Sequence, residues 1–246
     1  MRLLVLLLSI AMPLVGWLSQ TGAFGPDQGT VSDRYPTLLI AAGYAFSVWG
    51  LIFLLDLLYG IWQATGARRG DPVLARIAPA AALGFFLTTI WMPLFSLGLF
   101  WLCLLVIFGA LAALAWCALQ LSQPGAASGR RLAWLALSIH ASWLSLAAFL
   151  NLAQTIVAYR WLPTGNMLGW SLALWAIAAA LLLVLNARMR GNIAYLAIAA
   201  WGLIAVHIAQ SSSTLPGATV SAWVAVAIAI AVAVQTAWLQ RRRVRP

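Results

Sequence analysis

Long apolar runs separated by short polar segments make up most of the chain. A hydrocarbon core of about 30 Å requires roughly 20 apolar residues in helical conformation, so runs of this kind are typical of membrane-spanning helices. Eight runs can be counted: Leu3 to Leu18, Leu38 to Gln63, Ile77 to Trp91, Leu94 to Leu121, Leu132 to Val157, Leu168 to Leu185, Ile193 to Ala209 and Val220 to Leu239. The pattern therefore predicts an all-α integral membrane protein, an eight-span helical bundle.

Two parts of this pattern need a specific interpretation. The apolar stretch from Ile77 to Leu121 would be about 67 Å long as one helix, more than twice the hydrocarbon thickness. Its only interruption is Trp91-Met92-Pro93, so we expect a tight turn near Pro93. The polar segment Ser19 to Thr37 holds several glycines and prolines, and we expect it to form turns over the outer face.

Composition excludes a soluble globular domain. Hydrophobic residues make up 64% of the 246 residues, charged residues only 7%, and the mean hydropathy is +0.98, whereas ordinary domains contain about 25% charged residues. The net charge of +10 comes entirely from arginine against four aspartates. These arginines occur in short clusters between apolar runs, so we expect the lipid bilayer as a partner and no nucleic acid.

Arginine placement predicts the orientation of the eight spans. Only Arg34 and Arg160 fall in segments on one side, and the other twelve arginines fall on the opposite side. Because cytoplasmic loops carry the excess of positive charge, we expect both termini in the cytoplasm, with the bacterial inner membrane as the location. The first run could instead be a signal peptide, and the C-terminal Arg241 to Arg245 run is either a stop signal or a contact for anionic lipid.

Several polar or amphipathic side chains lie inside the predicted spans. An indole N–H in mid-span must face protein, water or ligand, and this applies to Trp49, Trp143 and Trp201. Asp56 is the only acid in a span, where ionisable groups usually face the bundle interior. Either histidine of the chain, His140 or His207, could ligate haem iron or form a packing hydrogen bond. No second acid lies in the spans and no spacing is typical of metal ligands, so we expect no metal site.

Three segments carry a resemblance to a known family. The second run contains Gly43-Tyr44-Ala45-Phe46-Ser47-Val48-Trp49-Gly50-Leu51-Ile52-Phe53, the third ends in Thr88-Thr89-Ile90-Trp91-Met92-Pro93, and the fifth contains Trp143 to Asn151. Together they resemble the translocator protein family, also called tryptophan-rich sensory proteins. The segment Ser32-Asp33-Arg34-Tyr35-Pro36 resembles the longer bacterial and plant members. The resemblance implies a translocator-like five-helix core over residues 1–158 and a three-helix C-terminal extension with a basic tail over residues 159–246.

The resemblance also implies an intramembrane ligand site. The residues concerned are Tyr44, Trp49, Phe53, Thr88, Trp91, His140, Trp143 and Asn151, with Asp56 as a proton or ligand contact. The implied ligand is a hydrophobic or amphipathic small molecule such as a sterol or a tetrapyrrole (porphyrin or haem). Positions that depart from the family's pattern include Thr88 in place of an Asn, Ile139-His140 in place of Pro-Tyr, and Phe53 in place of a Tyr.

Helix geometry favours the same site without the family. Residues 140, 143, 147 and 151 lie on one helix face at spacings of three and four, and aromatic rings there can sandwich a planar amphipathic ligand. In the alternative interpretation these residues only pack helices, and Asn151 forms an interhelical hydrogen bond. We expect a receptor or sensor, with a homodimer as the expected assembly. The alternatives are a transporter, indicated by Asp56 and the repeat of Trp49 to Ile52 as Trp201 to Ile204, and an intramembrane porphyrin-degrading enzyme.

Overall fold

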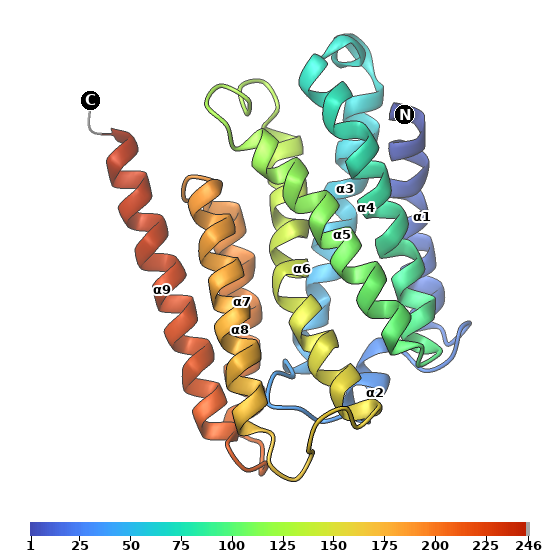
Figure 1. Cartoon of the computed structure of the whole chain (residues 1–246). Helices are drawn as coiled ribbons and strands as arrows, with labels where there is room; N and C mark the ends of the chain where they lie inside the picture. Colours follow the sequence, from blue (N-terminus) through green and yellow to red (C-terminus); the bar gives the residue numbers. More distant parts are fainter. Residues whose placement is uncertain (245–246) are drawn as a thin grey trace.

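The computed structural model describes residues 1–244, and these form an all-helical bundle (Figure 1). The elements are α1 (Arg2–Gln20), α2 (Gln28–Asp33), the 3₁₀ helix η1 (Gly43–Ser47), α3 (Val48–Ala64), the 3₁₀ helix η2 (Gly66–Gly70), α4 (Pro72–Ser96), α5 (Phe100–Leu121), α6 (Arg131–Ala158), α7 (Leu168–Arg188), α8 (Ile193–Ser211) and α9 (Ala218–Val244). Eight helices, with η1 and α3 taken together, are long and apolar enough to cross a membrane. The prediction of an eight-span membrane bundle is confirmed.

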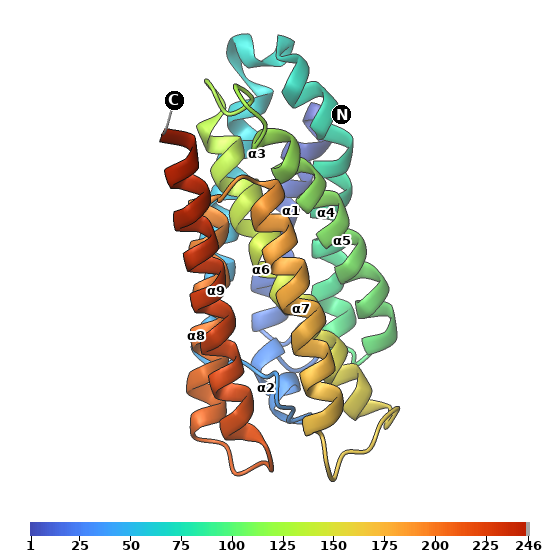
Figure 2. The ribbon, with the colours of Figure 1, turned by 60° about the vertical axis from the view of Figure 1, so that its left-hand side comes forward.

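Helix α6 lies at the centre of the bundle. It packs against α3 and α5 on one side and against α7 and α8 on the other, while α1 packs on α3 and α4, and α9 packs on α7 and α8. The two views in Figures 1 and 2 show these helices side by side, with both chain ends at the same end of the bundle. Small residues such as Ala141, Ser145 and Ala148 are fully buried on α6, and small side chains let helix backbones approach closely in a membrane.

The second span begins later than the sequence predicts. The predicted helix started at Leu38, but the chain is not helical until Gly43. Tertiary partners replace the missing helical hydrogen bonds of this segment: the Ala42 N–H donates to the Ala205 carbonyl at 3.0 Å. The Gln210 side chain donates to the Thr37 and Ile40 carbonyls, and the Ser221 hydroxyl donates to the Leu38 carbonyl. Non-helical backbone at membrane depth is tolerated only where protein or water satisfies it.

The turn between the third and fourth spans also differs from the prediction. Helix α4 continues through Pro93 to Ser96, and the chain reverses at Leu97–Leu99, where Gly98 has φ +72°. A proline removes one helical hydrogen bond but has a helical φ, whereas a glycine with positive φ ends a helix. The start of α4 is also earlier than the predicted Ile77, because the Asp71 side chain caps the helix by accepting from the Val73 and Leu74 N–H groups.

The segment before the second span is only partly irregular. Turns were predicted over residues 19–37, and the structure has the short helix α2 within them, with Asp27 as its N-cap. The Asp27 carboxylate accepts from the Thr30 N–H and hydroxyl, and these hydrogen bonds lower the pKa of Asp27. Helix α2 lies at the end of the bundle opposite to the two chain ends (Figure 1).

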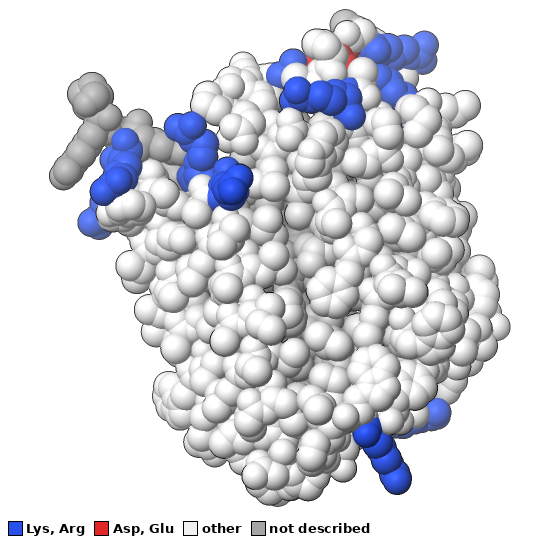
Figure 3. All heavy atoms as spheres, in the orientation of Figure 1, with Lys and Arg blue, Asp and Glu red and all other residues white. Residues whose placement is uncertain are grey.

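The arginines separate between the two ends of the bundle. Basic side chains gather at the end that holds both termini, and few lie at the opposite end (Figure 3). We call these the arginine-rich end and the opposite end. Arg34 follows α2 and Arg160 follows α6, which places both at the opposite end. In the C-terminal basic run, Arg245 lies outside the described residues.

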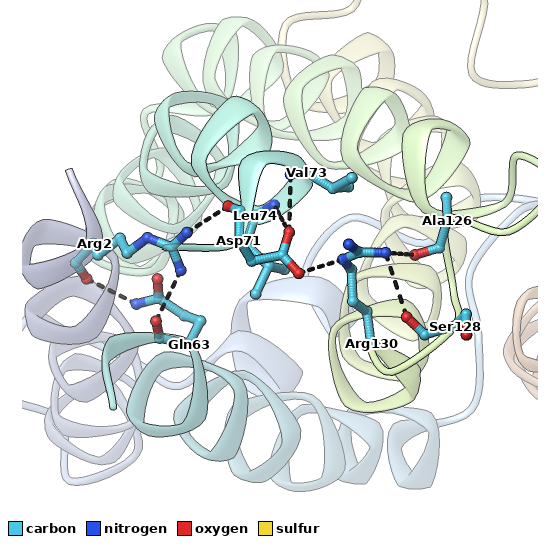
Figure 4. A network of polar contacts seen from close by, with 8 residues as sticks. All are labelled: Arg2, Gln63, Asp71, Val73, Leu74, Ala126, Ser128 and Arg130. Atoms are coloured by element: carbon cyan, nitrogen blue, oxygen red, sulfur yellow. Dashed lines mark hydrogen bonds and ion pairs between the residues drawn. The ribbon is translucent and has the colours of Figure 1, made fainter. Parts of the chain in front are cut away.

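A polar network joins α1, α3, the start of α4 and the α5–α6 loop at the arginine-rich end (Figure 4). The Arg2 guanidinium donates to the Gln63 and Asp71 carbonyls at 2.9 and 2.7 Å, and the Gln63 side chain donates back to the Arg2 carbonyl. Arg130 and Asp71 form an ion pair at 2.6 Å. Burial would raise the pKa of Asp71, but the hydrogen bonds from Leu74 and Val73 and the contact with Arg130 lower it below its usual value. The network ties the first helix and the α5–α6 loop to the start of α4.

Candidate intramembrane ligand site

Three tryptophans from three helices meet near the opposite end of the bundle. Trp49 of α3 lies 6.1 Å from Trp91 of α4 and 6.1 Å from Trp143 of α6, measured between ring centroids. Phe53, one turn further along α3, stacks on Trp49 at 5.4 Å. Phe46 of η1 makes an edge contact with Trp143 at 6.4 Å. The sequence reasoning selected four of these five rings and missed Phe46, although its position three residues before Trp49 indicates a shared face.

Asn151 and Trp143 have buried donors that other residues do not use. The Trp91 indole donates to the Asn151 Oδ1 at 2.9 Å, which leaves the Asn151 amide nitrogen free. Within residues 1–244, neither this nitrogen nor the Trp143 indole nitrogen has a hydrogen-bond partner, although both side chains are only 2% exposed. Buried polar groups are nearly always paired, so the two donors are available to a group that accepts hydrogen bonds.

Two cavities adjoin the aromatic cluster. A small one of about 30 Å³ is lined by residues that include Trp143, Asn151, Ala147 and Leu150. A larger one of about 380 Å³ lies between α1 and the start of α3, where Pro13, Gly16 and Phe53 line it. Both cavities share three wall residues, which are Phe46, Trp49 and Trp91. A ligand that shifted these rings would join the two spaces.

Asp56, His140 and Thr88 form a buried polar triad beside the cluster. The His140 Nδ1 lies 2.7 Å from the Asp56 Oδ2, and the His140 Nε2 lies 3.2 Å from the Thr88 hydroxyl. The imidazole stacks on Phe85 at 6.1 Å and makes an edge contact with Trp49 at 5.8 Å. Because both ring nitrogens already have partners, His140 has no free nitrogen for haem iron in this arrangement. Thr88 and His140 are two of the positions that depart from the translocator pattern, and they contact each other.

The structure does not bring every predicted residue to this site. Tyr44 is exposed, and its ring lies against Trp201 of α8 at 5.2 Å. The Trp201 indole donates to the Ala45 carbonyl at 3.3 Å, so this mid-span N–H faces protein. His207 contacts the Ala222 carbonyl and Trp223 on α9, away from the partners of His140. A haem held by both histidines does not fit this arrangement.

One polar feature of α3 was not anticipated. Asp56, Tyr59 and Gln63 are all fully buried and lie on one helix face at spacings of three and four. Each keeps one side-chain oxygen without a hydrogen-bond partner among the described residues. The face leads from the arginine-rich end towards the triad. Its spacing was visible in the sequence, but Tyr and Gln near a span end are also typical of a membrane interface.

The structure also locates the metal-ligating side chains, the cysteines and the polar contacts between spans. No group of three metal-ligating side chains lies close enough to hold a metal ion in residues 1–244. Cys103 and Cys117 are both free and buried. The polar contacts that join the first five spans to the last three include side-chain pairs such as Tyr195 to Ser145 at 2.8 Å and Asn192 to Ser138 at 2.7 Å.

Comparison with known proteins agrees with this architecture. A family model described as TSPO-like protein matches residues 2–238, which is nearly the whole chain. The match extends across both the first five spans and the last three, and the division at residue 158 stays a prediction. No curated protein and no solved structure matches the chain significantly. Because one family model covers more than nine-tenths of the sequence and the fold is the membrane helical bundle that the motifs imply, the chain belongs to the TSPO-like protein family.

Proposed function

We propose that this membrane protein is a receptor or sensor that binds a hydrophobic or amphipathic small molecule among Trp49, Trp91 and Trp143. The observation that carries the proposal is the pair of unpartnered buried donors, the Trp143 indole N–H and the Asn151 amide, beside a cavity. A site that only packs helices would gain nothing from leaving both donors unpaired, because each unpaired buried group costs about 1–3 kcal/mol. A ligand acceptor would recover that cost.

The lining indicates the chemistry of the ligand. Aromatic faces favour a flat apolar body, and two donors favour a carbonyl, hydroxyl or carboxylate oxygen on that body. A sterol offers one hydroxyl oxygen and a tetrapyrrole offers carboxylates, so we propose these two classes of ligand for the site. The 380 Å³ cavity is within the range of about 300–1,000 Å³ for small-molecule sites. A tetrapyrrole would also need the space beyond Trp49.

Quenching of tryptophan fluorescence in the purified protein tests the proposal. Protoporphyrin, haem and a sterol are titrated separately, and saturable quenching at one molecule per chain is the expected result for at least one of them. Four of the fourteen tryptophans, with Trp17 as the fourth, line the two cavities of the proposed site, so quenching should affect only part of the total fluorescence. Linear, non-saturating quenching by every compound would show partition into the micelle and contradict the proposal.

Two other activities use the same site and need separate assays. A transporter would move the ligand across proteoliposomes, and the buried Asp56–His140 pair would then make the flux depend on pH. A porphyrin-degrading enzyme would cause loss of porphyrin absorbance with time. Saturable binding without flux or absorbance loss is the result that we expect for a receptor.

We propose in addition that the arginine-rich end faces the cytoplasm of a bacterial inner membrane. Eleven of the thirteen arginines in residues 1–244 belong to that end, which follows the excess of positive charge in cytoplasmic loops. Reporter fusions after Arg69, Arg131, Arg190 and Arg243 should all report cytoplasm. Fusions near Asp27 and Gly217 should report the other side. An external signal after Arg131 would refute this orientation.

A further inference from the structure

A third cavity, of about 730 Å³, lies at the arginine-rich end and is separate from the aromatic site. Its walls come from the α5–α6 loop, the first residues of α6 and the turn between α7 and α8. In Figure 1 the loop and the turn lie at the end that holds both termini. Two of its lining residues are arginines, Arg131 and Arg190. The motifs of the sequence gave no indication of a site here.

The two lining arginines are both exposed, and they differ from some of the other arginines at this end. Neither guanidinium makes a hydrogen bond or an ion pair with the described residues. Two other arginines at this end do have partners: Arg130 pairs with Asp71, and Arg2 donates to the carbonyls of Gln63 and Asp71. The chain has only four acidic residues, and none of them lines the cavity. Both guanidiniums are exposed and are therefore free to contact an anion from outside the chain.

Backbone groups add to the positive potential of this cavity. Helix α6 begins at Arg131 without a side-chain cap, and α8 begins after its N-cap Asn192, which also lines the cavity. The N-terminus of a helix carries partial positive charge and free N–H groups. The Asn192 side chain already accepts from the Tyr195 N–H at the start of α8, so the uncapped N-terminus of α6 and the two guanidiniums are the main positive groups at this cavity. This combination is typical of a phosphate site.

The position of Arg190 is fixed by the turn that ends α7. Arg190 has φ +61° and Gly191 has φ +72°, and a left-handed backbone is uncommon for a residue with a side chain. The Gly191 N–H donates to the Asn186 carbonyl at 2.9 Å, and the Gln240 side chain donates to the Gly191 carbonyl. The Arg190 N–H also donates to the Ala187 carbonyl at 2.9 Å, so Arg190 and Gly191 complete the Schellman motif that ends α7, and this cap fixes the backbone from which the Arg190 side chain extends.

The rest of the lining is mixed, with polar residues such as Ser122, Gln123 and Ser128 beside an apolar part. Leu121, Trp134 and Leu135 contribute side chains to the walls, and a half-buried tryptophan at a span end is typical of the membrane interface. We propose that this cavity binds a phosphate-bearing amphiphile, with Arg131 and Arg190 contacting the phosphate and the apolar wall contacting the hydrocarbon part. An anionic phospholipid and a soluble phosphate share the phosphate chemistry, and the experiment distinguishes them.

Binding of short-chain lipids to the full-length protein in non-ionic detergent tests the assignment. The probes are dioctanoyl phosphatidylglycerol, dioctanoyl phosphatidylcholine and inorganic phosphate, with affinity measured by calorimetry and stoichiometry by native mass spectrometry. We expect one phosphatidylglycerol per chain and weaker binding of the zwitterionic lipid. Each of Arg131→Gln and Arg190→Gln should raise the Kd by about fivefold, and the double variant by about 25-fold.

Arg188→Gln is the matched control, because Arg188 lies two residues from Arg190 but does not line the cavity. It should bind phosphatidylglycerol as the parent does. Competition by inorganic phosphate at the affinity of the lipid would support the site with a soluble phosphate as its source, whereas lipid binding without competition supports a headgroup. Equal Kd values for both lipids, or an unchanged Kd in a double variant with parental thermal stability, would refute the proposal. Neither result would affect the aromatic site.

Discussion

Trp143→Ala is expected to weaken ligand binding by about tenfold to a hundredfold. The substitution removes a large buried ring, and full burial of a large apolar side chain is worth roughly 1.5–3 kcal/mol. It also removes the indole N–H, one of the two free donors beside the small cavity. Fluorescence titration with the ligand that quenches the parent protein gives the Kd. Asn151→Ala should weaken binding as well, because it removes the second donor and the acceptor of the Trp91 indole.

Two further variants serve as controls for this effect. Trp238→Ala should leave the Kd unchanged, since Trp238 is about half exposed and contacts Arg242 near the arginine-rich end. Trp143→Phe should recover part of the lost affinity, because a ring face remains while the donor is absent. Unfolding temperatures must match before the Kd values are compared. If folded Trp143→Ala and Asn151→Ala bind like the parent, both residues are packing elements.

The buried triad should show the largest effect on stability. His140→Leu removes the partner of Asp56 in a location where both side chains are fully buried, and breaking a buried pair on one side costs about 3–5 kcal/mol. The Thr88 hydroxyl loses a partner in the same variant. The free energy of unfolding, measured by titration with a denaturing detergent in mixed micelles, should fall by about that amount.

The double variant Asp56→Asn/His140→Leu distinguishes a buried charge from lost packing. An amide has nearly the volume of the carboxylate and carries no charge, so it should restore a large part of the stability that His140→Leu loses. Asp56→Asn alone should have a smaller effect, because the amide oxygen can still accept from His140. If the single and double variants are equally unstable, the loss comes from packing against Phe85 and Trp49 and not from the pair.

The sequence identified the residues that depart from the translocator pattern, but it did not predict that they contact each other. Thr88 and His140 were identified separately as substitutions in the third and fifth spans, and Asp56 as an isolated acid in the second. In the structure they are one hydrogen-bonded unit. Trp91 and Asn151, which are 60 residues apart in the chain, were expected near each other only through the family resemblance, and a direct hydrogen bond joins them.

The sequence by itself determined the class of protein, the number of spans and the separation of charge between the two ends. A backbone in lipid must satisfy its hydrogen bonds within each span, so about 20 apolar residues mark a helix whatever it packs against. Composition then excludes a soluble fold, and the arginines that flank the spans lie at their ends. None of these conclusions requires knowledge of how the helices are rotated.

Only the tertiary structure decided which helix faces meet. Spans that are apolar all round have no amphipathic stripe that reveals the inward face, and small and polar residues contact a neighbour only when the rotation of both helices is fixed. For this reason the paired triad, the free donors of Trp143 and Asn151, and the exposed position of Tyr44 could not be derived from spacing. The late start of the second span has the same cause, since Gln210 and Ser221 of distant helices satisfy its carbonyls.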